Sequence, residues 1–168
     1  MTRTGMPLLM LMLVSVVSLS QQPPPKTPAS PAQVIPVPHV FNITPKQKAR
    51  KNPVPFTDVA VEQGKKLYES QCAMCHGSNG KGDGDLARAL KIAPPDFTKP
   101  SVLAKRTDGE LFTIIGEGTT PMPGQKHRMS DLQRWELVDF LRSLQGKTPR
   151  PATPAERQLL KHEVVVHP

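Results

Sequence analysis

The segment Cys72-Ala73-Met74-Cys75-His76 constrains this chain more than any other feature, because it contains both of the chain's cysteines. Two thiols three residues apart lie on one helical turn, where each can add across a vinyl group of the same porphyrin. The imidazole of the next residue, His76, is then in position to bind the iron. The spacing therefore predicts one covalently bound haem c, held by Cys72 and Cys75, with His76 as a ligand of the metal.

Two other uses of a cysteine pair fit the sequence less well. A structural zinc site takes four ligands, and the chain has no second cysteine pair. A thioredoxin-like dithiol follows a strand in a βαβ unit, whereas the residues before Cys72 have a helical pattern. Haem attachment is therefore the preferred interpretation.

The first 20 residues have the pattern of a secretory signal peptide. Arg3 precedes an apolar run from Leu8 to Leu19, and small residues follow at Ser18 and Ser20. The run is shorter than the roughly 20 residues that span a bilayer, although an uncleaved anchor that tethers the protein to a membrane is the alternative. Either interpretation predicts a periplasmic or secreted protein.

Residues 21–55 hold ten of the twenty prolines, and they predict an extended, semi-rigid linker. The linker is partly basic, because Lys46, Lys48, Arg50 and Lys51 lie close together near its end. This run is interpreted as a solubilising segment or as a patch that steers an acidic partner or a membrane surface. Residues 148–168 are expected to form a flexible tail.

The folded domain is expected to span residues 56–147. It carries 13 Lys and Arg residues against 12 Asp and Glu residues, so the basic charge of the whole chain is concentrated in the flanks. No nucleic-acid partner is therefore expected. The sequence pattern of the domain predicts an all-α fold of three to five short helices, with disordered flanks.

Helix boundaries in the domain are marked by capping residues. Thr57 is a candidate N-cap of a helix that runs into the cysteines. Capping boxes at Thr107 with Glu110 and at Ser130 with Gln133 predict two further helices. A short helix is also possible over residues 85–91. Gly64 is costly inside a helix, by about 1 kcal/mol relative to Ala, so another element is expected to approach it closely, near Phe140.

The second axial ligand of the iron is predicted from a methionine in a stiff loop. Met122 lies between Pro121 and Pro123, which fix the backbone on both sides. His127 and Met129 are the competitors. His127 lies between two basic residues, which indicates solvent, and Met129 precedes a helix cap, which indicates packing. The predicted metal ligands are therefore His76 and Met122.

On these motifs the chain resembles class I cytochromes c over roughly residues 57–146. In that family a glycine and an aromatic residue precede the first cysteine by eight and four positions, and Gly64 and Tyr68 match them. The resemblance implies a bundle around one covalent haem, with Met122 as the distal ligand. It also implies that the carbonyl of Pro94 or of Pro95 supports the proximal imidazole. The Pro-rich linker and the tail depart from the family pattern.

The expected function is that of a one-electron carrier. The sequence shows no catalytic constellation, so an enzyme is not expected, although a role as a subunit of one stays open. The expected partners are redox proteins such as a dehydrogenase, an oxidase or another cytochrome. The alternative is a haem enzyme or ligand sensor with an open distal iron position, which a fixed Met122 disfavours.

Overall fold

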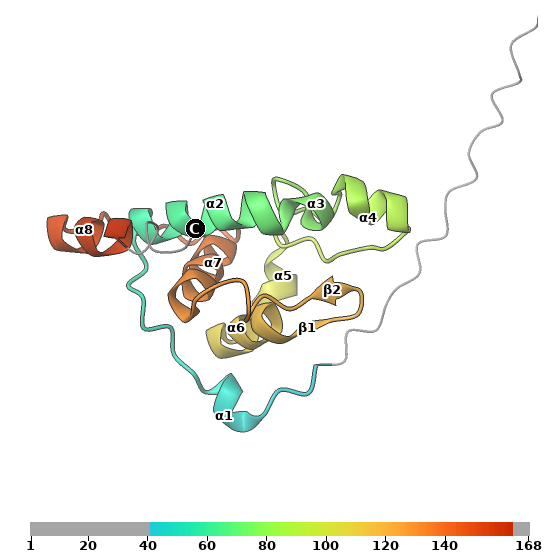
Figure 1. The fold of residues 1–168 in the computed structure, drawn as a ribbon, viewed down its shortest axis with the longest axis horizontal. Coiled ribbons are helices and arrows are strands. Elements are labelled where there is room, and N and C mark those ends of the chain that lie inside the picture. The colour runs from blue at the N-terminus through green and yellow to red at the C-terminus, as the bar shows by residue number, and fades with distance from the viewer. Residues whose placement is uncertain (1–40, 163–168) are drawn as a thin grey trace, which may run out of the picture. The chain divides into compact units, whose positions relative to one another are not determined.

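The computed structural model describes residues 41–162, and Figure 1 shows how the helices of this part pack together. The segments predicted as a signal peptide and as most of the linker, and the last six residues, lie outside the described residues. In chain order the elements are α1 (Pro45–Lys48), α2 (Asp58–Gln71), α3 (Ala73–His76), α4 (Asp85–Leu90), α5 (Pro100–Leu103), α6 (Asp108–Glu117), β1 (Gly118–Thr119), β2 (Met122–Pro123), α7 (Asp131–Ser143) and α8 (Pro154–His162).

The all-α prediction is confirmed for the part of the chain that is described. The helix number exceeds the expected three to five, because α1, α3, α4 and α5 are short helices of four to six residues. Helix α8 also lies beyond the predicted domain. None of the helices between residues 41 and 162 is long and apolar enough to cross a membrane.

The predicted caps begin the three long helices of the domain. The hydroxyl of Thr57 accepts a hydrogen bond from the amide of Ala60 at the start of α2. Thr107 and Ser130 form the expected capping boxes of α6 and α7 with the residues three positions later. Each cap satisfies amide groups that the helix itself leaves unpaired.

Helices α2 and α7 cross at Gly64, as the sequence predicts. A Cβ at this position would overlap the carbonyl oxygen of Glu136 and would lie 3.0 Å from Cβ of Phe140. One turn later, the ring of Tyr68 packs against that of Phe140 at a centroid distance of 5.0 Å. The crossing brings the backbones of the two helices together and fixes the end of α2 that leads into the cysteines.

The core lies around α7, and Figure 1 shows α2 and α6 packed on this helix. Phe112 of α6 stacks on Trp135 of α7 at a centroid distance of 4.1 Å. The other buried apolar side chains of this cluster come mainly from the three long helices: Ala60, Tyr68, Leu111, Ile115, Leu137, Val138, Phe140 and Leu141.

Residues 41–55, called here the N-terminal strap, form the end of the linker predicted over residues 21–55, and they pack on the domain. The guanidinium of Arg50 covers the ring of Phe112 at 4.2 Å. The amide of Asn52 donates a hydrogen bond of 2.8 Å to the carboxylate of Asp139, and the side chain of Val54 is buried. The strap therefore contacts both α6 and α7.

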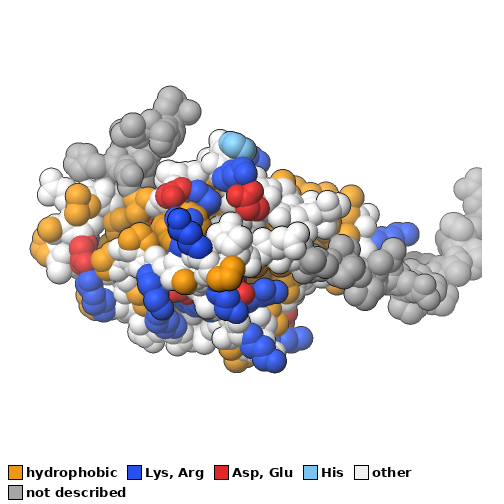
Figure 2. Space-filling model, turned by 90° about the horizontal axis from the view of Figure 1, so that it is seen from below, with side chains coloured by type: hydrophobic (Ala, Val, Ile, Leu, Met, Phe, Trp, Pro, Cys, Tyr) orange, Lys and Arg blue, Asp and Glu red, His pale blue; other side chains and the backbone are white. Residues whose placement is uncertain are grey.

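The basic run of the strap is correspondingly less available to a partner. Lys48 forms an ion pair of 3.6 Å with Glu110, and Arg50 forms one of the same length with Asp131. Lys46 and Lys51 are exposed. Figure 2 shows that Lys and Arg side chains are spread over the face seen from below, with Asp and Glu side chains among them. The run is therefore partly a structural element of the domain.

The segment after residue 147 also packs on the domain, in contrast to the predicted flexible tail. The amide of Ala152 donates a hydrogen bond of 2.8 Å to the carboxylate of Asp58, at the start of α2. Arg157 of α8 forms an ion pair of 2.7 Å with the same carboxylate, and Leu160 is buried. These contacts fix α8 on the first turn of α2.

Candidate haem site

The two cysteines lie at the junction of α2 and α3. Cys72 ends α2 and begins α3, and its amide donates a hydrogen bond of 2.8 Å to the carbonyl of Tyr68. Cys75 follows one turn later, and both thiols are free and half-buried. The structure therefore presents two unpaired thiols on one turn, as the attachment motif requires.

The environment of the thiols disfavours a thiolate metal site. Burial, together with a smaller effect of the nearby Cys75, raises the pKa of the Cys72 thiol to about 12. A protonated thiol is a poor metal ligand, because metals bind the thiolate. Within residues 41–162 no group of three or more His, Cys, Asp and Glu side chains could hold a metal ion.

His76 ends α3, and hydrogen bonds fix the backbone carbonyls of His76 and of the next residue. The carbonyl of His76 accepts a hydrogen bond of 2.8 Å from the amide of Gly82. The next carbonyl, that of Gly77, accepts one of 2.9 Å from the buried hydroxyl of Tyr68. Gly77 has a φ of +74°, a left-handed conformation that a glycine adopts without strain. The main chain at the predicted iron ligand is thereby held in place.

The loop after His76 folds back against the Pro-Pro segment. A Cβ at Gly82 would overlap the carbonyl oxygen of Pro94 and would lie 3.4 Å from that of Pro95. Both carbonyls therefore lie beside Gly82, whose amide donates a hydrogen bond to the backbone carbonyl of His76. The support of the imidazole by one of these two carbonyls stays a prediction, with both prolines as candidates.

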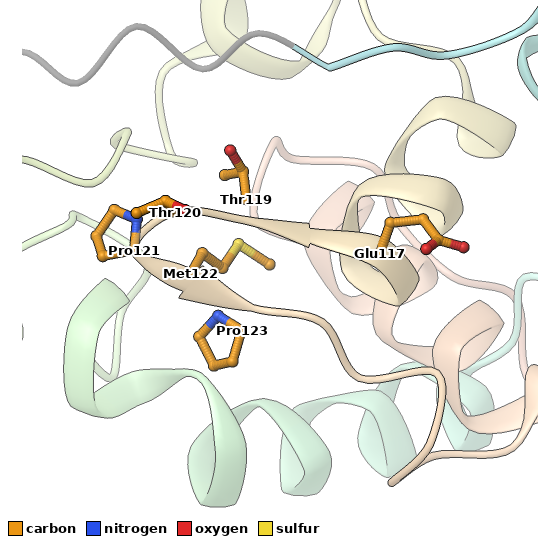
Figure 3. Close-up of a pocket in the computed structure, with 6 residues that line it drawn as sticks. All are labelled: Glu117, Thr119, Thr120, Pro121, Met122 and Pro123. Atoms are coloured by element: carbon orange, nitrogen blue, oxygen red, sulfur yellow. The ribbon is translucent and has the colours of Figure 1, made fainter.

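Met122 lies on a small hairpin between α6 and α7. Strand β1 pairs antiparallel with β2, so that Thr119 faces Met122 and Gly118 faces Pro123. Figure 3 shows Met122 between Pro121 and Pro123, with its side chain lying between the two strands. These residues, with Glu117, Thr119 and Thr120, line an open hollow of about 390 Å³. The methionine that the sequence selects is therefore half-buried and carried by a paired segment of backbone.

The base of this hairpin is tied to the end of α6. The amides of Gln125 and Lys126 donate hydrogen bonds of 2.9 and 3.1 Å to the carbonyls of Ile115 and Gly116. The ammonium group of Lys126 pairs with the carboxylate of Glu117 at 2.7 Å. This hydrogen bond holds the pKa of Glu117 below its ordinary value, so this carboxylate is charged at neutral pH. The base of the hairpin that carries Met122 is therefore held against α6.

The competitors for the distal position lie where the sequence indicates. His127 is exposed, between two basic side chains that are also exposed. Met129 is 6% exposed and packs in the apolar core immediately before α7. Neither environment resembles the half-buried, proline-flanked setting of Met122.

One feature of the site was missed from the sequence. The ring of Phe97 stacks on the imidazole of His76, with centroids 4.8 Å apart and planes inclined by 21°. The segment Pro94-Pro95-Asp96-Phe97 resembles that of bacterial members of the family, but no motif or periodicity places the ring of Phe97 on that of His76. Only the approach of Phe97 to the glycine loop, where its amide donates to the carbonyl of Gly80 at 2.7 Å, brings them together.

The residues present fit a haem c. Two free thiols share a turn, an imidazole follows them directly, and glycines with positive φ, Gly77, Gly80 and Gly82, shape the loop beside them. A thioether is available on a tethered hairpin. Imidazole and thioether are a known pair of iron ligands in haem proteins that transfer electrons.

Comparison with known proteins gives a family match at the same residues. Residues 61–145, just over half of the chain, match the family model described as Cytochrome c. The subunit CcoP of the cbb3-type cytochrome c oxidase of Azospirillum brasilense is 30% identical over 88 residues, which are 52% of this chain and 29% of that protein. A thiosulfate dehydrogenase of Stutzerimonas stutzeri (strain A1501) is 28% identical over 92 residues, which are 54% of this chain and 29% of that protein. The chain thus spans less than a third of the length of these curated relatives.

Two solved structures also resemble the chain. The Kuenenia stuttgartiensis reducing HAO-like protein complex Kustc0457/Kustc0458 matches with 30% identity and a TM-score of 0.49, over 56% of this chain and 49% of that one. The KustC0563 c-type cytochrome matches with 31% identity and a TM-score of 0.43, over 48% of this chain and 95% of that one.

Proposed function

We propose that this chain, which belongs to the cytochrome c family, attaches its haem through Cys72 and Cys75 and holds the iron between His76 and Met122. Family membership gives the chain one covalently bound haem c and a role in electron transfer. The residue assignment is supported chiefly by one observation: both thiols and the imidazole lie on a single helical turn, and a tethered hairpin offers the thioether.

The chain's own residues have distinct tasks in this proposal. A bound haem c supplies an iron that gains and loses one electron. Cys72 and Cys75 tether the group, and the hydrogen-bonded backbone around His76 limits movement of the ligand between the two redox states. The base of the hairpin, tied to the end of α6, would hold the thioether of Met122 in place as the distal ligand. These features favour a carrier over the alternative enzyme or sensor.

The proposed electron donors and acceptors are proteins of respiratory or dehydrogenase systems. The relatives include an oxidase subunit and a thiosulfate dehydrogenase, so partners of these two kinds are the first to test. We also propose a periplasmic or secreted location, with residues 1–20 as a signal peptide or membrane anchor, and a folded unit that includes residues 41–55 and 148–160 with the predicted domain.

Replacement of Met122 by Ala tests the distal assignment. The oxidised wild type should be low-spin and show the weak near-infrared sulfur-to-iron charge-transfer band of Met-ligated haem. Met122→Ala should lose this band and bind carbon monoxide when reduced, because removal of the thioether opens the iron. His127→Ala and Met129→Ala are the controls. Both should keep the band, even if the loss of the buried Met129 side chain lowers stability.

The covalent attachment has its own test. Acid-acetone extraction should leave the haem on the polypeptide, and the intact mass should include one haem. Extraction of all the haem would contradict the role of Cys72 and Cys75. A reduced wild type that is high-spin and binds carbon monoxide readily would favour the open-site alternative.

A further inference from the structure

The stack of Phe97 on His76 is the contact from which a further role follows. The two ring centroids are 4.8 Å apart and the ring planes are inclined by only 21°. The imidazole therefore lies nearly parallel to a second flat ring. A rotation of the imidazole about its bond to Cβ would bring it into steric conflict with the phenyl ring of Phe97.

The Phe97 ring is itself held by the chain. The amide of Phe97 donates a hydrogen bond of 2.7 Å to the carbonyl of Gly80, in the loop that follows His76. The two residues that flank Phe97 bind each other. The carboxylate of Asp96 accepts hydrogen bonds from the amide and the hydroxyl of Thr98, at 3.0 and 2.6 Å. The Phe97 side chain is partly buried and packs on the apolar core. The stack therefore rests on a fixed support.

The hydrogen bonds described above hold the main chain around His76, and the ring of Phe97 contacts the imidazole itself. The carbonyls of His76 and Gly77 are both bonded, and neither bond involves the imidazole. Rotation about the bond between Cβ and an aromatic ring has a broad energy profile. Groups that touch a metal-bound histidine commonly set its orientation, and a flat ring stacked on it restricts that rotation by steric contact.

We propose that Phe97 is a positioning residue that sets the plane of the His76 imidazole about its bond to the iron. The proposal rests on the proposed role of His76 as an axial ligand. The orientation of an axial imidazole determines how the unpaired electron is distributed over the porphyrin, so a change of ring plane is visible in magnetic spectra of the oxidised protein.

The experiment compares four variants of the haem-loaded protein. Phe97→Leu and Phe97→Met remove the flat ring, and the unbranched, flexible methionine side chain, of similar volume to leucine, serves in case the leucine variant folds poorly. Phe97→Tyr keeps the ring. Phe112→Leu is the matched control, because it also removes a phenyl ring from the core. The ring of Phe112 is buried and stacks on Trp135, not on His76.

Electron paramagnetic resonance g values and the proton shifts of the four haem methyl groups are the readouts, with the midpoint potential as a third. Phe97→Leu and Phe97→Met should change the g values, the spread of the methyl shifts and the potential. Phe97→Tyr should retain the wild-type spectra. Phe112→Leu should lower the melting temperature and leave the spectra unchanged.

Two outcomes would overturn the proposal. Phe97 variants that melt earlier but keep the wild-type g values and methyl shifts would show that Phe97 only packs the core. A Phe97→Tyr variant as perturbed as Phe97→Leu would show that the flat ring is not the determinant. Failure of the ligand assignment is distinguishable, because it would appear in the wild type as the absence of a low-spin His/Met spectrum before any variant is compared.

Discussion

Replacement of Gly64 by Ala should destabilise the protein by about 2 kcal/mol. The added Cβ would overlap the Glu136 carbonyl oxygen and lie 2.5 Å from its carbonyl carbon, whereas non-bonded carbons prefer about 3.5–4.0 Å. Helices α2 and α7 would therefore have to separate by roughly 1 Å. Overpacking of this kind costs about 1–3 kcal/mol or more. We expect an overpacking cost at the upper end of that range, because the overlap involves backbone atoms. The better helix propensity of alanine offsets about 1 kcal/mol of this cost.

Urea unfolding followed by fluorescence of Trp135, the chain's one tryptophan, measures this loss. A loss of about 2 kcal/mol corresponds to a melting temperature lower by roughly 8 °C. Glu62→Ala is the control, because Glu62 is an exposed residue of the same helix and should change the free energy of unfolding by less than about 0.5 kcal/mol. A Gly64→Ala variant as stable as the wild type would refute the close crossing of the two helices.

Two further predictions concern the N-terminal strap. Arg50→Ala should lower the free energy of unfolding by about 1–2 kcal/mol, because the guanidinium covers the Phe112 ring at 4.2 Å. The control Lys51→Ala should change the free energy of unfolding by less than about 0.5 kcal/mol. Equal effects of the two variants in urea unfolding would contradict the contact. Burial raises the pKa of Asp139 from 3.8 to about 7, so the wild type should lose stability as the pH rises through this range, by up to about 1.4 kcal/mol per pH unit. Asp139→Asn, which can still accept the hydrogen bond from Asn52, should lose this dependence when unfolding is compared at about pH 5 and pH 8, and an unchanged slope would exclude Asp139 as its source.

Local capping signals predicted the three long helices of the domain, whereas the short α5 was not predicted. The caps at Thr57, Thr107 and Ser130 were predicted because they depend on residues only three positions apart. The approach of another element to Gly64 was predicted because a glycine inside a helix is costly unless close packing requires it. The attachment motif is equally local. The Met122 assignment goes further, because it needs a contact across the haem, and it stays a prediction.

Contacts between distant residues were not available from these patterns. A proline-rich segment predicts an extended backbone, and the strap is largely extended, but composition does not tell whether an extended segment lies on a protein surface. The pairing of Asn52 with Asp139 joins residues 87 positions apart. The stack of Phe97 on His76 and the contact of Arg157 with Asp58 are of the same kind. Each depends on the final arrangement of the helices, which periodicity does not fix.

Helix α7 explains why the domain extends beyond the predicted boundaries. A helix on a protein surface buries one apolar stripe and leaves its polar side in water, but eight consecutive residues of α7, Arg134–Leu141, are buried. The apolar side packs on α2 and α6. The polar side needs its own partners, and the strap supplies one of them where Asn52 bonds to Asp139. A chain shortened to residue 56 would leave this side of α7 without the strap, so the strap belongs to the fold that supports the haem site.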